Sequence, residues 1–165
     1  MKTLILTRHA KSSWDDPMLD DHERVLNGRG RRGAEAIGLW LGRLGLLPGE
    51  VLVSDAVRTL ETWAGVADAA GAQATVRAMP ELYHASPQEM LDALRTAKAD
   101  AVMMIAHNPG IASFAAGMVD EPPAHSRFRD YPTAATCIIE FDIADWSEVE
   151  RASGRVAEFV MPHDL

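Results

Sequence analysis

Four arginine or histidine side chains lie at or just beyond the ends of strand-length apolar runs. They are Arg8 and His9 after residues 2–7, Arg58 after residues 51–53, and His107 after residues 101–106. Two guanidinium groups can hold a phosphate dianion through paired hydrogen bonds. A neutral imidazole can attack phosphorus. A second imidazole, if protonated, places positive charge beside the oxygens over which a transferring phosphoryl group spreads its negative charge. These side chains would therefore suit phosphoryl transfer if the fold brings them together.

Each of these signals is weak alone. An Arg-His dipeptide arises by chance, a histidine at a strand end is more often structural, and Arg58 could be an ordinary surface charge. Their coincidence is more informative, because ligands of open α/β sheets bind beyond the carboxyl ends of the strands. Zinc is the main rival for paired histidines. The six histidines show no short-spaced ligand pair and no His-Glu-x-x-His helix, so we expect no metal site.

Alternating apolar and helical patterns predict the elements that would position these residues. Strands are expected at residues 2–7, 51–53, 74–79, 101–106, 136–143 and 155–160. Helices are expected from the cap Asn27 to Gly45, from the cap Ser54-Asp55 to about Gly71, from the capping box at Ser86 to near Ala97, and from Gly110 to Val119. Residues 120–135 are expected to form a loop. Strands that alternate with helices predict an α/β fold with a largely parallel sheet, with an antiparallel pair at the end of the chain.

The bulk properties predict one domain, residues 1–165, in the cytoplasm. No apolar run approaches the length of a membrane span, the apolar start is too short for a signal peptide, and Cys137 is the only cysteine. The net charge of −8 argues against nonspecific nucleic-acid binding. Residues 1–43 carry a net charge of +2 and residues 44–165 a net of −10. This asymmetry could supply a positive pocket for an anionic substrate, although an ordinary solvated surface is the simpler interpretation.

The ordered motifs resemble the histidine phosphatase superfamily, the relatives of cofactor-dependent phosphoglycerate mutase, and most of all its short SixA-type branch of phosphohistidine phosphatases. The matching segments are Leu6-Thr7-Arg8-His9-Ala10-Lys11-Ser12, Leu26-Asn27-Gly28-Arg29-Gly30, Val53-Ser54-Asp55-Ala56-Val57-Arg58-Thr59, Pro80-Glu81-Leu82-Tyr83, Ala106-His107-Asn108-Pro109-Gly110-Ile111 and Pro132-Thr133-Ala134-Ala135. The resemblance spans almost the whole chain. It implies a three-layer α/β/α sandwich, phosphoglycerate mutase-like, with a mostly parallel mixed sheet.

The resemblance also implies a role for each matching residue. His9 would be the nucleophile that becomes phosphorylated, and Arg8, Arg58 and His107 would line the phosphate pocket, with no metal or organic cofactor. Glu81 occupies roughly the position of the proton donor, but it could equally be a carboxylate in a turn after a strand. One departure is Ala10, where the superfamily usually has glycine.

Larger relatives insert a helical lid between the equivalents of Arg58 and His107, and here there is little room for one. An open site predicts a phosphorylated protein as substrate, such as a histidine phosphotransfer domain, because a lidded site suits a small metabolite better.

A phosphatase of broad or small-molecule specificity, acting on small phosphate esters, is the alternative with the same site. A non-catalytic phosphate-binding module is a third interpretation, which the intact pair of His9 and His107 disfavours. Neither a nucleic acid nor a membrane is expected as a partner.

Overall fold

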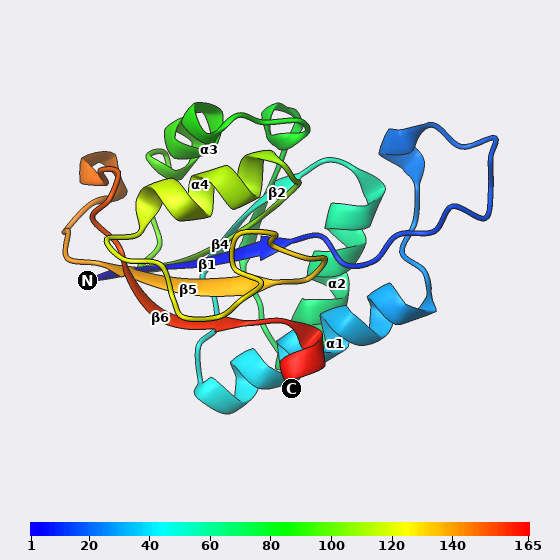
Figure 1. Cartoon of the computed structure of the whole chain (residues 1–165), viewed down its shortest axis with the longest axis horizontal. Helices are drawn as coiled ribbons and strands as arrows, with labels where there is room; N and C mark the ends of the chain where they lie inside the picture. Colours follow the sequence, from blue (N-terminus) through cyan, green and yellow to red (C-terminus); the bar gives the residue numbers. More distant parts are fainter.

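The computed structural model describes all of residues 1–165 and is built around one six-stranded sheet (Figure 1). The strands are β1 (Lys2–Arg8), β2 (Glu50–Ser54), β3 (Thr75–Met79), β4 (Ala101–Ala106), β5 (Thr136–Phe141) and β6 (Arg155–Val160). The helices are α1 (Gly28–Leu44), α2 (Val57–Ala70), α3 (Pro87–Leu94) and α4 (Gly110–Met118). Short 3-10 turns are η1 (Asp21–Glu23), η2 (Pro80–Leu82), η3 (Trp146–Glu148) and η4 (Pro162–Asp164). No helix is long and apolar enough to cross a membrane.

The strand order is β3-β2-β4-β1-β5-β6. The pairs β3/β2, β2/β4 and β4/β1 are parallel, whereas β5 pairs with β1 and β6 pairs with β5 in antiparallel fashion. The predicted mostly parallel sheet with an antiparallel pair at the end of the chain is therefore confirmed. Because β1, β2 and β4 run in the same direction, their carboxyl ends meet at one edge of the sheet.

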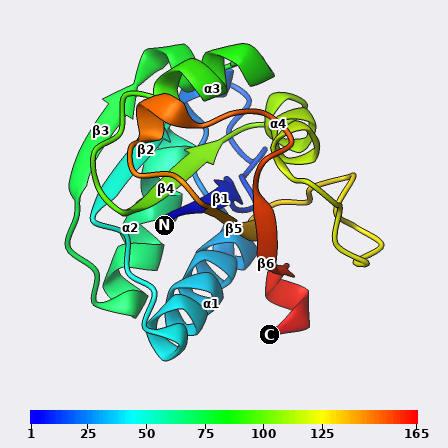
Figure 2. The ribbon, with the colours of Figure 1, turned by 90° about the vertical axis from the view of Figure 1, so that its left-hand side faces the viewer.

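Helices cover both faces of the sheet and make a three-layer sandwich, with α1 and α2 on one side and α3 and α4 on the other (Figure 2). Alternate residues of each strand enter opposite cores, because side chains along a strand point to alternate faces. Leu4 and Leu6 join the core beneath α3 and α4, while Ile5 joins the core beneath α1 and α2. Cys137 lies in the first core, where burial raises the pKa of its thiol to about 12.

Local sequence signals fix most helix ends. Asn27 accepts a hydrogen bond from the Gly30 amide at 2.8 Å, and Gly45 ends α1 in the left-handed region at φ 67°. Ser86 and Glu89 form the predicted capping box at the start of α3. That helix stops at Leu94 and not near Ala97, because Thr96 and Ala97 continue as tighter turns bonded to Ala93 and Leu94.

The predicted cap of α2 is wrong. Ser54 is the buried last residue of β2, and the cap position is taken by Ala56, which makes no side-chain capping bond. The Ser54 hydroxyl accepts from the Ala56 amide at 3.3 Å and faces His107 across the sheet edge. The Ser54 hydroxyl does not cap the helix, because it is hydrogen-bonded to His107, a residue far away in the sequence.

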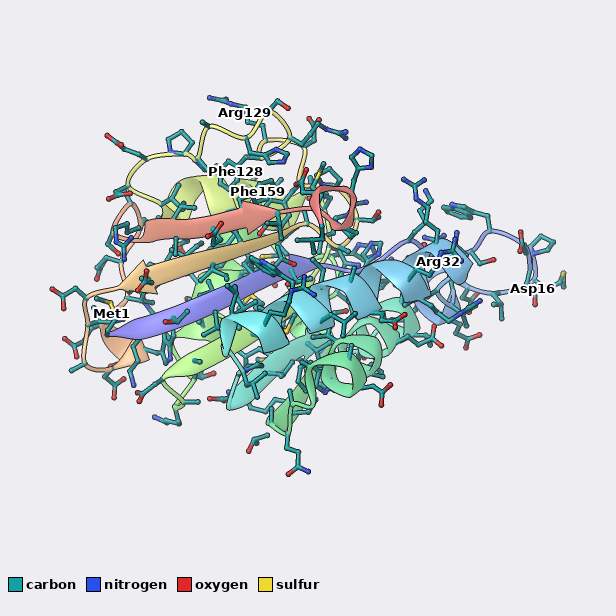
Figure 3. All side chains as sticks on the ribbon, turned by 90° about the horizontal axis from the view of Figure 1, so that it is seen from below. Met1, Asp16, Arg32, Phe128, Arg129 and Phe159 are labelled. Carbon is teal, nitrogen blue, oxygen red and sulfur yellow. The ribbon has the colours of Figure 1, made fainter.

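Two irregular segments lie at the carboxyl ends of the parallel strands. Residues 9–27 leave β1, project from the body and return to α1 through η1 (Figure 1). Asp16 lies at the far end of this projection (Figure 3). Residues 119–135 connect α4 to β5. Between them these segments flank the ends of β1 and β4.

Candidate active site

The end of the parallel strands forms a cavity of about 230 Å³. Arg8 is the last residue of β1, His9 follows it, His107 follows β4, and Arg58 lies in the first turn of α2. The structure brings these four predicted site residues together as lining of the cavity. The other lining residues are Lys11, Ser12, Trp14, Arg24, His84, Asn108 and Thr133.

His9 is held in a single orientation by the backbone around it. Its Nδ1 lies 2.7 Å from the carbonyl oxygen of Ala10, and its amide donates to the carbonyl of Ala106 at 3.1 Å. Because a carbonyl oxygen can only accept, Nδ1 must carry the proton when the ring is neutral. The lone pair is then on Nε2, which makes no hydrogen bond within the protein.

The charge state of His9 also suits a nucleophile. Burial lowers its pKa to about 3, and the positive charges of Arg8 and Arg58 act in the same direction against the opposing effect of the Ala10 carbonyl. The imidazole is therefore neutral near pH 7. A neutral imidazole with a free Nε2 between two guanidinium groups can attack the phosphorus of a bound phosphoryl group.

His107 lies beside His9, with ring centroids 5.2 Å apart. Its Nε2 is 2.8 Å from the Ser54 hydroxyl, which also accepts from the Ala56 amide. A hydroxyl that donates to Nε2 leaves the proton of the neutral ring on Nδ1, and the imidazolium carries a proton on both nitrogens. Burial lowers the pKa of His107 to about 3, with contributions from His9 and Arg58. A bound phosphate dianion would oppose that shift and favour the imidazolium.

Three ring or guanidinium nitrogens at this cavity are buried without a partner in the protein. They are Arg8 Nε, Arg58 Nε and His107 Nδ1. Buried donors are almost always paired, and their clustering at one place indicates an acceptor-rich ligand. A phosphoryl group, with three oxygens and two negative charges, matches that donor set.

Asp21 orients Arg58. The Arg58 guanidinium donates to the backbone oxygen of Asp21 at 2.7 Å and to its carboxylate at 3.0 Å. The same carboxylate accepts from the Tyr83 hydroxyl at 2.5 Å and from Arg24 at 3.2 Å. The Tyr83 hydrogen bond and the two arginines hold the pKa of Asp21 well below its usual range. The ionised carboxylate therefore fixes the position of the guanidinium.

The segment before β5 braces the other arginine. The carbonyl of Tyr131 accepts from Arg8 at 3.3 Å, and the Tyr131 hydroxyl donates to the carbonyl of Leu6 at 2.6 Å. The Ala134 amide donates to the carbonyls of both Arg8 and His9. Tyr131 and Ala134 adopt positive φ values of 48° and 61°, which non-glycine residues rarely do. The predicted loop is thus an ordered support of the site.

A family model described as the histidine phosphatase superfamily (branch 1) matches residues 4–86. The chain belongs to the histidine phosphatase superfamily. An uncharacterized chloroplastic protein of Arabidopsis thaliana is 36% identical over 120 residues, which are 66% of this chain and 55% of that protein. An uncharacterized protein of Mycobacterium leprae is 27% identical over 164 residues, 94% of this chain and 99% of its own. The match thus spans little more than half of the first relative and nearly all of the second.

Solved structures of SixA proteins are similar over nearly the whole chain. A SixA protein of Nakamurella multipartitia, named as a phosphohistidine phosphatase, has a TM-score of 0.82 and 27% identity, with 98% of this chain and 96% of that chain covered. A SixA protein of Agrobacterium tumefaciens has a TM-score of 0.80 and 22% identity, with 98% of each chain covered. These likenesses confirm the phosphoglycerate mutase-like sandwich. Membership of the histidine phosphatase superfamily supports phosphatase activity.

The departure from the usual histidine phosphatase pattern at Ala10 is accommodated by the core. Ala10 is fully buried in the cluster that contains Leu26, Ala34 and Ile37. Its amide donates to the Thr62 hydroxyl at 2.9 Å. The extra methyl group therefore packs beneath α1 and leaves the cavity open.

Glu81, the predicted proton donor of this histidine phosphatase, does not join the other four residues. It lies exposed on η2 and does not line the cavity, although Tyr83 and His84 follow it closely. His84 does line the cavity, with a left-handed φ of 62°. Catalytic groups sometimes approach only in the substrate complex, so the role of Glu81 stays a prediction.

Sequence reasoning missed several residues of the site. Asp21 carries no local signal of its role in orienting Arg58, and nothing local indicates Tyr83 as its partner. The spacing of three between Asp21 and Arg24, a common ion-pair pattern, is the one sequence signal that could have found them. The charged or titratable groups that line the cavity are guanidinium, imidazole and ammonium groups, and no cluster of three or more His, Cys, Asp or Glu is placed to hold a metal ion.

Proposed function

We propose that the protein hydrolyses phosphohistidine in a phosphorylated protein, with His9 as the nucleophile. The observation that supports this most is the geometry of His9, whose Nε2 makes no hydrogen bond within the protein and which lines a cavity with three unpartnered buried nitrogens. The SixA proteins that resemble the chain are named for the same substrate class. The same cavity would serve a small phosphate ester, which remains the alternative substrate.

The reaction has two steps. His9 Nε2 attacks the phosphorus, the P–N bond of the substrate breaks, and its electron pair goes to the leaving imidazole, which takes up a proton from solvent and departs as a neutral molecule. A phosphorylated His9 results. Water then attacks this phosphorus, the bond to Nε2 breaks, and inorganic phosphate leaves while His9 returns to its neutral state. Arg8, Arg58 and His107 would stabilise the charge on the equatorial oxygens in both steps. No metal is required by this donor set.

An open site favours a protein substrate. Residues 59–106 form mainly the rest of α2, then β3, η2, α3 and β4, so that stretch leaves little room for a lid. The rim is formed in part by Trp14, a residue that is 73% exposed and whose ring stacks on the Arg24 guanidinium at 3.5 Å. A phosphorylated side chain on a protein surface could enter without any closure.

Trapping the covalent intermediate tests the nucleophile. Incubation with labelled phosphoramidate should give an acid-labile, base-stable phosphoryl adduct in the parent and in a His125→Gln control. The His9→Ala variant should not label, and its turnover should fall by about a thousandfold or more. Labelling of His9→Ala at the level of the parent would show that another residue is the nucleophile.

Substrate comparison tests the rest of the proposal. Values of kcat/KM would be measured for a phosphohistidine peptide, a phosphoserine peptide and p-nitrophenyl phosphate. We expect the phosphohistidine peptide to be preferred. A preference for the small ester would favour the broad-specificity alternative, and no turnover of any of the three would favour a phosphate-binding module.

A further inference from the structure

A second cavity, of about 590 Å³, opens beside the catalytic one. It lies between the start of α1, the segment before β5 and η4, and we call it the basic groove. Its charged or titratable lining residues are all basic: Lys11, Arg29, Arg32, Arg127 and His163. Figure 3 shows Arg32 on the end of α1 nearest the projecting segment that carries Asp16. No aspartate or glutamate lines the groove.

Three of these cations have no counter-ion. Lys11, Arg29 and Arg32 form no ion pair, and Arg127 pairs only with the exposed Asp130. The chain has 24 acidic and 16 basic residues, so a random surface would place carboxylates among them. The first turn of α1 contains no acidic residue, although the helix dipole favours anions there and disfavours arginines. The cations cluster here although the chain is acidic overall and the helix dipole disfavours them. Such a cluster of unpaired cations indicates an anionic ligand.

The basic groove is continuous with the catalytic cavity. Lys11 and Thr133 line both. A Cβ on Gly30 would lie 2.0 Å from the carbonyl oxygen of Lys11, so glycine lets α1 pack directly against the segment that follows His9. A substrate that places a phosphoryl group at His9 would therefore have its neighbouring groups over the groove.

We propose that the basic groove binds acidic side chains that flank the phosphohistidine of a protein substrate. This inference rests on the function proposed above. The guanidinium and ammonium groups are exposed and come from three separate segments. A site for a small metabolite would enclose its ligand and bury the polar groups that fix it. Exposed cations spread around an open groove suit the acidic surface of a macromolecule, which they attract and orient.

A matched pair of peptides tests the groove. Both carry one phosphohistidine, and they differ only in having Asp and Glu, or Asn and Gln, at the flanking positions. The enzymes are the parent, Arg29→Gln/Arg32→Gln, and the control Arg43→Gln/Lys98→Gln. The control makes the same change in charge at exposed, unpaired sites near the opposite end of the strands. The readout is the ratio of kcat/KM for the acidic peptide to that for the amide peptide.

We expect a ratio of about ten for the parent and the control, the scale of a few exposed ion pairs, and about two or less for the groove variant. The ratio of the parent should fall towards one in 0.5 M NaCl.

A ratio near one for the parent, or an unchanged ratio for the groove variant, would overturn the inference while leaving the phosphatase proposal intact. If the groove variant instead lost only its activity on a small bisphosphate ester, the groove would serve a metabolite. Failure of the parent to hydrolyse either peptide would overturn the proposed function and this inference with it.

Discussion

The reactivity of this site depends on how individual side chains are held. An ordinary histidine is partly protonated near neutral pH, and its two nitrogens exchange roles. Here the Ala10 carbonyl fixes the proton of His9 on Nδ1, and burial keeps the ring neutral. Arg58 is fixed in a similar way by the ionised Asp21. Residue identity supplies the chemistry, but the immediate surroundings decide which atom can react.

At the same scale, Glu81 provides a test of how the leaving group departs. The Glu81→Ala variant should slow hydrolysis of an alkyl phosphate by about tenfold or more and hydrolysis of phosphohistidine by about twofold or less. An alkoxide needs a proton from an acid, whereas an imidazole leaves as a neutral molecule once its ring nitrogen is protonated. Steady-state kinetics on both substrates would measure this, with Glu35→Ala as the exposed control. Equal losses on the two substrates would contradict the prediction.

At the scale of elements, the site is an assembly of strand ends and two braced segments. Parallel pairing of β1 with β4, and of β4 with β2, carries three polar strand ends to one edge. Helix α1 closes that edge by packing on the segment after His9. The contact depends on glycine at position 30, since a side chain there would collide with the backbone of Lys11.

The Gly30→Ala variant should therefore lose both stability and activity. Overpacking of this kind destabilises by about 1–3 kcal/mol, and displacement of Lys11 would also shift His9. We expect kcat/KM to fall by about tenfold or more. Gly42→Ala on the same helix is the matched control, because its new methyl would be 3.7 Å from its nearest neighbour. That variant should gain up to about 1 kcal/mol and keep full activity. Thermal unfolding together with kinetics would check both, and parent-like behaviour of Gly30→Ala would show that α1 can move away freely.

At the scale of the whole molecule, the buried histidines link the site to the stability of the fold. The folded protein keeps His9 and His107 neutral down to about pH 3, because burial lowers the pKa of each. The unfolded chain protonates the same residues below about pH 6.5. The free energy of unfolding should therefore fall as the pH drops from 6.5 towards 3.

Between pH 7.5 and pH 5.5 each histidine should remove about 1.4 kcal/mol of stability, so the two together should remove roughly 2.7 kcal/mol. Urea unfolding at the two pH values would measure this loss in the parent and in His9→Gln/His107→Gln. The variant should lose less, since it lacks both groups. Equal losses would mean that other residues govern the acid sensitivity. Binding of inorganic phosphate, which favours the imidazolium of His107, should reduce the loss in the parent.

The sandwich and four residues of the candidate site could be predicted before the structure was known. Period-two and helical patterns, the Asn27 cap and the Ser86 capping box are local signals, so they can be interpreted without knowledge of distant contacts. The convergence of Arg8, His9, Arg58 and His107 followed from a topological rule, because parallel strands place their carboxyl ends together. The prediction of a cap at Ser54-Asp55 is wrong, because the hydroxyl of Ser54 is hydrogen-bonded to the distant His107.

The hydrogen bonds and pKa values of those residues depend on contacts that form only when the chain folds. Asp21 and Tyr83 are 62 residues apart in the chain, and their hydrogen bond depends on the packing of η1 beside η2. The neutral state of His9 arises from burial, which no local pattern reports. The basic groove brings together residues from the first and the last quarter of the chain. Through-space distances set hydrogen bonds, pKa values and charge clusters, and those distances exist only once the chain has folded.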